Sequence, residues 1–152
     1  MSFTVNGKTA LVTGANRGIG EGFVQTLLKA GASKIYAAAR DIESLAAVVA
    51  LNPEVVRAVE LDVTKPDQIQ ALAEKTQQLD ILVNNAGIID SALSSALDAA
   101  EFARREMEVN LFGPMQLTNL LIPKLKQSSE GAIVNISSIA AMSNFPSIGT
   151  YS

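Results

Sequence analysis

The chain of 152 residues is 48% hydrophobic and has a formal net charge of −3. This size and composition suit one globular domain, and the acidic balance argues against nucleic-acid binding or a polybasic membrane-surface role. The sequence has no cysteine and no histidine, which excludes disulfides, thiolate nucleophiles, Cys- or His-bound metals and Ser-His-Asp hydrolysis. Acid–base chemistry must therefore come from Tyr, Lys, Asp or Glu, and we expect no metal site.

The sequence gives no sign of export or membrane insertion. Its longest unbroken apolar run, residues 45–51, is too short to cross a bilayer. The first residues, MSFTVNGKT, lack the basic start and apolar stretch of a secretory signal peptide. We therefore expect no membrane association and a cytoplasmic location.

Five short apolar runs predict β-strands at residues 9–12, 34–38, 55–61, 81–83 and 132–136. Such nearly continuous runs are typical of strands that a parallel sheet buries on both faces. Helical segments separate them, at about 17–30, from 41 onward, after 64 and at about 99–126. The alternation predicts an α/β fold. We expect a Rossmann-type, doubly wound parallel sheet in one domain spanning residues 1–152, with the ligand crevice beyond the carboxyl ends of the strands.

Two of the predicted helices have distinctive features. Thr64 is expected to cap the third helix, with Pro66 in its first turn and Asp67 at the capping-box spacing. In the fourth helix, Gly113 and Pro114 are expected to produce a kink. This helix is apolar around most of its circumference. We therefore expect part of it to cover the sheet and the rest to meet a further part of the chain or another subunit.

The segment TGANRGIG, residues 13–20, joins the first predicted strand to the first predicted helix. A strand, a glycine-rich turn and a helix N-terminus form a phosphate site, because backbone N–H groups and the helix dipole face the ligand. Gly14 allows the tight turn, Gly18 lets the backbone approach a pyrophosphate, and Gly20 lets helix and strand pack closely. The alternative is a glycine-rich turn without a ligand.

Arg40 follows the second predicted strand, where dinucleotide folds often have an acidic residue for a ribose 2′-hydroxyl. A guanidinium at this position can instead pair with a 2′-phosphate, and Arg17 in the glycine turn can reach the same group. The two arginines favour NADP(H) over NAD(H). The alternative is that Arg40 is a solvated residue followed by the helix-capping Asp41, and that Arg17 faces solvent.

Two further strand ends have groups suited to a nucleoside. Asp62 follows the third strand and can accept a hydrogen bond from the amino group of an adenine, although a simple turn residue is an equal alternative. Residues 84–87, NNAG, follow the fourth strand. Their small and amide residues would let the backbone approach a ribose, and the alternative is an ordinary turn.

These motifs occur in order along the whole chain: TGANRGIG at 13–20, Asp62-Val63, NNAG at 84–87, Asn110, Ile136-Ser137-Ser138 and Tyr151. The ordered set resembles the short-chain dehydrogenase/reductase family of single-domain Rossmann oxidoreductases. The resemblance implies an NADP(H)-dependent enzyme that interconverts a small-molecule carbonyl compound and an alcohol, and that forms a homodimer or homotetramer. The cofactor-binding residues that it implies are Gly14, Asn16, Arg17, Gly18, Ile19, Gly20, Arg40, Asp62, Val63, Asn85, Ala86 and Gly87.

The resemblance also implies three catalytic residues. Ser138 would hydrogen-bond the substrate oxygen, Tyr151 would be the general acid in reduction and the base in oxidation, and Asn110 would hold a water in the proton relay. Negative charge grows on the substrate oxygen as a hydride reaches the carbonyl carbon, so two hydroxyl donors there would stabilise it. A free tyrosine has a pKa of about 10, which a nearby lysine and the oxidised nicotinamide must lower.

In the family that lysine lies four residues after the tyrosine, whereas the sequence gives one residue after Tyr151. The family also continues through another helix and two more strands, so we expect the sheet to stop after the fifth strand. Two interpretations stay open: the N-terminal part of a complete reductase, or a non-catalytic NADP-binding fragment that acts as a dimerising or regulatory module. Substrate choice would depend on residues after Tyr151 and on segment 88–100, whose composition suggests a modest apolar carbonyl compound.

Overall fold

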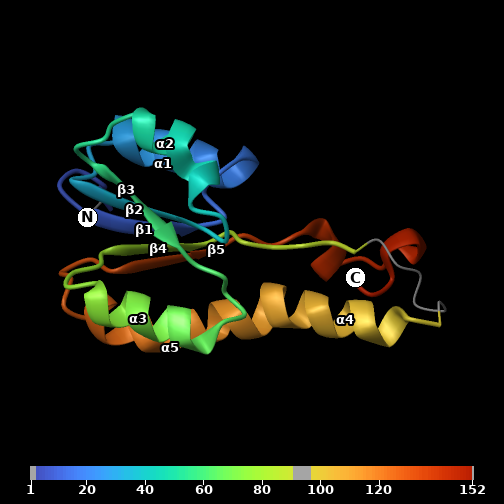
Figure 1. Ribbon diagram of the computed structural model, residues 1–152. Coiled ribbons are helices and arrows are strands. Elements are labelled where there is room, and N and C mark those ends of the chain that lie inside the picture. The colour runs from blue at the N-terminus through green and yellow to red at the C-terminus, as the bar shows by residue number, and fades with distance from the viewer. Residues whose placement is uncertain (1–2, 91–96, 152) are drawn as a thin grey trace.

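The computed structural model describes residues 3–90 and 97–151. Within these residues, five strands form one sheet in the order β3-β2-β1-β4-β5, and every neighbouring pair is parallel (Figure 1). The strands are β1 (Thr9–Thr13), β2 (Lys34–Ala39), β3 (Val56–Glu60), β4 (Ile81–Asn84) and β5 (Ala132–Asn135). The order reverses between β1 and β4, which confirms the predicted doubly wound α/β fold and puts the ligand crevice at the carboxyl ends of these two strands.

Helices cover both faces of the sheet (Figure 1). One face carries α1 (Gly18–Lys29) and the short α2 (Ala46–Ala50), and the other carries α3 (Pro66–Lys75) and α5 (Gly113–Leu125). The helix α4 (Ala99–Met107) extends beyond the sheet on the side where the strands end. The segment that contains Tyr151 lies on this same side, so α4 and the end of the chain flank the crevice.

Alternating strand residues divide the core into two layers. On β1, Ala10 and Val12 pack with residues of α1 and α2, such as Val24 and Val48. Leu11 points to the opposite face, where it joins a cluster of α3 and α5 residues. All three β1 residues are fully buried. This burial on both faces explains why the strand is apolar at consecutive positions.

The start of α3 differs from the prediction, because Lys65 and not Thr64 is the N-cap, and no side chain caps the helix. The Thr64 hydroxyl instead donates to Asp62 Oδ1 at 2.8 Å. The preceding helix begins as a 3₁₀ turn, Glu43–Leu45, that leads directly into α2, so helical residues cover the region predicted from about 41 onward.

The long fourth helix contains a π-helical turn, Glu108–Phe112, between α4 and α5. The Gly113 N–H donates to the Glu108 carbonyl five residues earlier, and Pro114 follows with no N–H to donate. The expected kink at Gly113-Pro114 is therefore a widened turn directly before these residues, and the helix continues through it (Figure 1). Such turns are frequent at functional sites, and Asn110 lies in this one.

The apolar surface of the long helix is only partly used. Leu117, Leu121 and Leu125 of α5 are buried against the sheet. Five other apolar side chains of the long helix, each at least 37% exposed, are Met107, Leu111, Phe112, Met115 and Leu120. Contact of this surface with another subunit stays a prediction. In the described part of the chain, no helix combines the length and apolar character that bilayer crossing requires.

Candidate active site

Two adjoining pockets lie at the carboxyl ends of the strands. The arginine pocket, which we name for Arg17 and Arg40, has a volume of about 700 Å³ and lies between the glycine turn and the ends of β2 and β3. The tyrosine pocket, named for Tyr151, has a volume of about 820 Å³ and lies between residues 135–138 and the long helix. Ile19 and residues 85–88 line both pockets, so the two form one continuous groove.

All of the predicted cofactor residues except Gly20 line the arginine pocket. Gly14 and Gly18 have φ values of +63° and +56°, which only glycine adopts at little cost. A Cβ on Gly18 would meet no atom within 4 Å, so open space lies before the turn where a phosphate could approach. Gly20 does not line the pocket but lets α1 pack closely on the glycine turn, because a Cβ there would overlap the Gly14 carbonyl oxygen.

The arginine pocket has two exposed cationic side chains, and the charge of one of them, Arg40, also acts on the carboxylate of Asp62. Arg17 and Arg40 are both exposed, and neither guanidinium forms a hydrogen bond or an ion pair within residues 3–90 and 97–151. Asp41, next to Arg40, accepts from the Glu43 N–H at 3.0 Å, but the N-cap of the 3₁₀ turn is Ile42, so Asp41 is not the helix cap that the alternative interpretation expected. The two guanidinium groups are therefore available to an anionic ligand.

Asp62 is held as a carboxylate at the end of β3. Partial burial acts to raise its pKa, but hydrogen bonds from the Thr64 N–H and hydroxyl, with the positive charges of Arg40 and Lys65, outweigh burial and lower the pKa. Both hydrogen bonds end on Oδ1, at 2.9 and 2.8 Å. The Oδ2 atom has no hydrogen bond among the described residues, so it can accept one from a ligand in the arginine pocket.

Asn85 connects the two pockets to the glycine turn. Its side-chain Nδ2 donates to the carbonyl oxygens of Thr13 and Gly14, at 2.9 and 3.1 Å. A Cβ on Gly14 would lie 3.0 Å from Ala86 Cα, which shows how closely the two loops approach. The amide of Asn85 thus braces neighbouring strands while its backbone and Ala86 form the shared wall.

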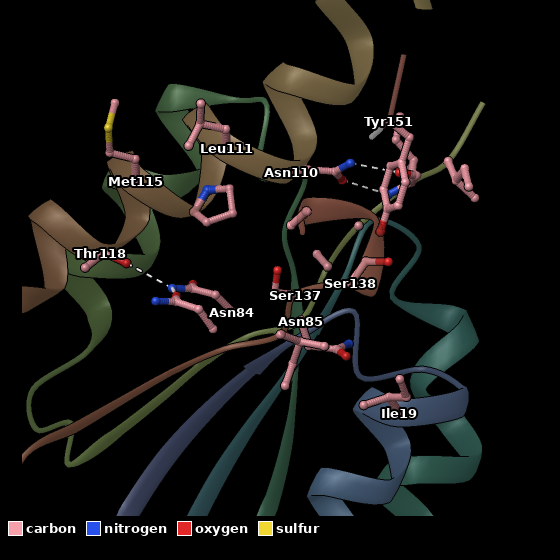
Figure 2. A pocket seen from close by; sticks show the side chains of 18 of the residues that line it. Ile19, Asn84, Asn85, Asn110, Leu111, Met115, Thr118, Ser137, Ser138 and Tyr151 are labelled. Carbon is pink, nitrogen blue, oxygen red and sulfur yellow. Dashed lines mark hydrogen bonds between the residues drawn. The ribbon is translucent and has the colours of Figure 1, made fainter. Parts of the chain in front are cut away.

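The three predicted catalytic residues all line the tyrosine pocket. Figure 2 shows the ring of Tyr151 directed toward Ser138, which follows β5. The Ser138 Oγ accepts from the Ala140 N–H at 3.2 Å, so its own proton remains free to be donated. The Asn110 side chain exchanges two hydrogen bonds with the backbone of Ile88, at 2.9 and 2.8 Å (Figure 2). These two bonds use one N–H and one lone pair of the amide, so Asn110 anchors the backbone of Ile88, and its role with a water stays a prediction.

Three polar residues in or beside the groove had no individual role in the sequence prediction, although Asn84 belongs to the predicted segment 84–87. Thr13 braces the shared wall through its hydroxyl, and Ser44 lines the arginine pocket. Asn84, 5% exposed, donates from Nδ2 to Thr118 and Asn135, while its Oδ1 is buried without a partner in the described residues (Figure 2). Thr13 could have been found from its place in the TGANRGIG motif. Asn84 could have been found in the same way, from the NNAG segment, whereas Ser44 has no comparable signal, because serine is common in ordinary turns.

This architecture, with a glycine turn at the switch point of a doubly wound sheet, defines a Rossmann-type dinucleotide-binding class of protein. The short chain dehydrogenase family model matches residues 8–152. The chain therefore belongs to the short-chain dehydrogenase family. This result confirms the resemblance derived from the ordered motifs. The part of the chain that the structure describes contains no cluster of three or more acidic side chains arranged to hold a metal.

Individual relatives extend the comparison. The chain is 39% identical to retinol dehydrogenase 13 of Mus musculus over 147 residues, which cover 90% of this chain and 42% of the relative. A short chain dehydrogenase from Burkholderia cenocepacia in complex with NADP matches with a TM-score of 0.89 and 38% identity, over 98% of this chain and 61% of that one. A 3-ketoacyl-(acyl-carrier-protein) reductase from Brucella melitensis complexed with NADH matches with a TM-score of 0.89 and 33% identity, over 97% of this chain and 64% of that one. The chain thus spans only part of each relative's length.

Proposed function

We propose that the full-length protein is an NADP(H)-dependent oxidoreductase that interconverts a carbonyl compound and an alcohol. The observation that carries this proposal is the continuous groove. One end has two unpaired guanidinium groups, the other has the hydroxyls of Ser138 and Tyr151, and residues 85–88 form a wall common to both. A dinucleotide in such a groove would have its phosphates at one end and its reactive ring at the other.

The residues of the arginine pocket fit a dinucleotide with a 2′-phosphate. The space before Gly18 and the positive φ of the turn suit a pyrophosphate beside the N-terminus of α1. Arg40 and Arg17 would hold the 2′-phosphate, and Asp62 Oδ2 would accept from the adenine. The similar proteins of known structure include one in complex with NADP and one complexed with NADH, so the preference for NADP(H) rests on the arginines. When bound, the cofactor supplies or receives a hydride.

In the tyrosine pocket, Ser138 and Tyr151 would act on the substrate oxygen. Both hydroxyls would donate hydrogen bonds to the oxygen as it gains negative charge, and Tyr151 would then transfer its proton. Ser138 Oγ accepts a hydrogen bond from the Ala140 N–H, so the hydroxyl proton of Ser138 stays free to be donated to the substrate oxygen. Ser138 would therefore orient the substrate, and Tyr151 would be the general acid in the reductive direction.

Asn110 would support proton transfer through its backbone carbonyl. Its side-chain amide binds the backbone of Ile88. Pro114, four residues later, has no N–H for the Asn110 carbonyl, so this carbonyl can accept from a water. The lysine that the family has four residues after the tyrosine would take part in the same relay.

The test uses the full-length protein with NADPH and a panel of benzaldehyde, cyclohexanone and 2-octanone. Tyr151→Phe should reduce turnover by at least about 100-fold and Ser138→Ala by a similar factor, with the Kd for NADPH within about twofold of the wild-type value. Cofactor binding without turnover in the wild-type protein would support a non-catalytic NADP-binding module instead. Full activity of either variant would contradict the assigned roles.

A further inference from the structure

We infer that Glu106 is a positioning residue that sets the wall of the tyrosine pocket by holding the backbone of Asp90. Glu106 lies in α4, four residues before Asn110. Its Oε1 accepts from the Asp90 N–H at 2.8 Å. Because a pocket wall matters only if the pocket binds a substrate, this inference rests on the proposed function.

The distance between Glu106 and Asn110 along the helix matches the distance between Asp90 and Ile88, the residues that they contact. Asn110 binds the N–H and carbonyl of Ile88, and Glu106 binds the N–H of Asp90. Four helical residues rise about 6 Å, and two residues of an extended chain span about 6.6 Å. The chain after β4 runs on past α4 (Figure 1). One face of the helix therefore holds alternate residues of that segment, a pairing that we call the clasp.

The environment of Glu106 points to a role in the clasp rather than in solubility. The residue is only 3% exposed, although a carboxylate is costly to bury. Its Oε2 is buried without a hydrogen-bond partner in the described residues. An apolar side chain at this position would avoid the cost of burying a carboxylate, but it could not accept the hydrogen bond from Asp90.

The neighbouring Arg105 provides a matched comparison. Its Nη2 lies 3.6 Å from Asp90 Oδ1, and its side chain is 58% exposed. Exposed ion pairs of this kind contribute little. Adjacent helix residues thus contact the same residue of the segment, one through a buried backbone hydrogen bond and the other through a solvated ion pair. Glu106 should therefore contribute more than Arg105 to holding Asp90 in place.

The position of the clasp links it to substrate binding. Ile88 and Ile89 line the tyrosine pocket together with Tyr151 and Ser138. Asn110 fixes one end of this pair of isoleucines, and Glu106 fixes Asp90 directly after them. Loss of the second contact would let Ile89 move while the glycine turn and the arginine pocket stay in place.

The test compares three variants of the full-length protein: Glu106→Leu, Glu106→Gln and Arg105→Gln. Hydrogen–deuterium exchange without cofactor or substrate should rise about tenfold in rate for peptides covering residues 88–90 in Glu106→Leu. Glu106→Gln keeps an oxygen acceptor and should retain protection, as should Arg105→Gln. With NADPH and the best carbonyl of the panel, Glu106→Leu should raise KM about tenfold and leave the Kd for NADPH within about twofold.

The exchange and kinetic measurements separate two failures. Unchanged exchange in Glu106→Leu, or an equal rise in Arg105→Gln, would overturn the clasp. A rise in exchange without a change in KM would show that the clasp does not set the substrate wall, and would overturn the inference. Absence of turnover in the wild-type protein would contradict the proposed function, whereas the exchange result would still decide whether Glu106 holds the segment.

Discussion

The hydroxyl of Thr13 accepts hydrogen bonds from the backbone N–H groups of both Asn85 and Ala86, each at 3.0 Å. It also donates to the Val83 carbonyl at 3.4 Å, so its full hydrogen-bonding capacity is used. Thr13 ends β1, and Asn85 directly follows β4. The Thr13 side chain thus connects the ends of β1 and β4 at the switch point of the sheet, and it links the glycine turn to the wall shared by the two pockets.

Replacement of this threonine should affect stability and cofactor binding together. Thr13→Val keeps the shape but leaves the Asn85 and Ala86 N–H groups without an acceptor, which should lower the free energy of unfolding by about 2–4 kcal/mol. Thr13→Ser keeps the hydroxyl and should lose much less. Urea denaturation and NADPH titration would measure both effects. Equal stability of Thr13→Val and Thr13→Ser would contradict the bracing role.

The role of Arg40 can be tested by reversing its charge. Arg40→Asp should repel a 2′-phosphate and offer an acceptor to a ribose 2′-hydroxyl, so the Kd for NADPH should rise by at least about tenfold while that for NADH changes little or falls. Binding is measured by cofactor fluorescence at fixed salt, since exposed charges are screened. If NADPH remained the favoured cofactor in this variant, Arg40 would not be the determinant.

Two glycines on the same helix should respond in opposite directions to alanine. A Cβ on Gly20 would lie 2.6 Å from Asn85 Nδ2 and overlap the Gly14 carbonyl, whereas one on Gly22 would meet nothing within 4 Å. Gly20→Ala should therefore destabilise the protein by about 1–3 kcal/mol. Gly22→Ala should stabilise it by up to about 1 kcal/mol through helix propensity. Thermal denaturation without cofactor measures both, and a shift of the same sign would contradict the packing.

Asp80 should make stability depend on pH in the acid range. It lies before β4, where its carboxylate accepts from the Thr9 N–H at 2.8 Å and from the Ser128 hydroxyl at 2.5 Å. Burial acts to raise its pKa, but these hydrogen bonds, the charge of Lys8 and a bond from Gln78 lower it overall. A lowered folded-state pKa stabilises the fold above the unfolded-state pKa of about 3.9, and this contribution disappears as the pH falls through the folded-state value.

Asp80→Asn should therefore be less stable than wild type at pH 7, by about 1–2 kcal/mol. The difference between the two proteins should begin to shrink below about pH 4, where Asp80 of the unfolded wild-type chain takes up a proton, and should disappear once the pH passes the lowered folded-state pKa. Urea denaturation at several pH values gives the comparison. A difference that stays constant from pH 7 to pH 3 would mean that the charge of Asp80 does not contribute.

The predictable parts of the fold are those with local causes. The five strands were expected within one or two residues at each end, because a strand buried on both faces needs consecutive apolar residues. The π-turn at Glu108–Phe112 could not be predicted, since one extra residue in a turn hardly changes an apolar periodicity. Thr64 failed as an N-cap because its hydroxyl has a nearby alternative acceptor in Asp62, which competes with the helix end.

Residues of the groove were likewise predictable only where they have a local cause. Its glycines and its strand-end residues were identified because each has a local motif. Glu106 was not, since a glutamate in an amphipathic helix usually lies on the solvated face, and its burial depends on Asp90, 16 residues earlier in the chain. Residues 91–96 of the expected substrate segment lie outside the described residues. Long-range contacts of this kind leave no periodic trace in the sequence.

The wall formed by residues 85–88 has a thermodynamic consequence. Because the same backbone borders both pockets, a molecule bound in one pocket would contact residues that also contact a molecule bound in the other. If a bound dinucleotide increases the affinity for a carbonyl compound by some factor, the carbonyl compound must increase the affinity for the dinucleotide by that same factor. The order in which the two ligands bind is then a matter of kinetics, whereas any coupling between them through the loop after β4 is equal in both directions.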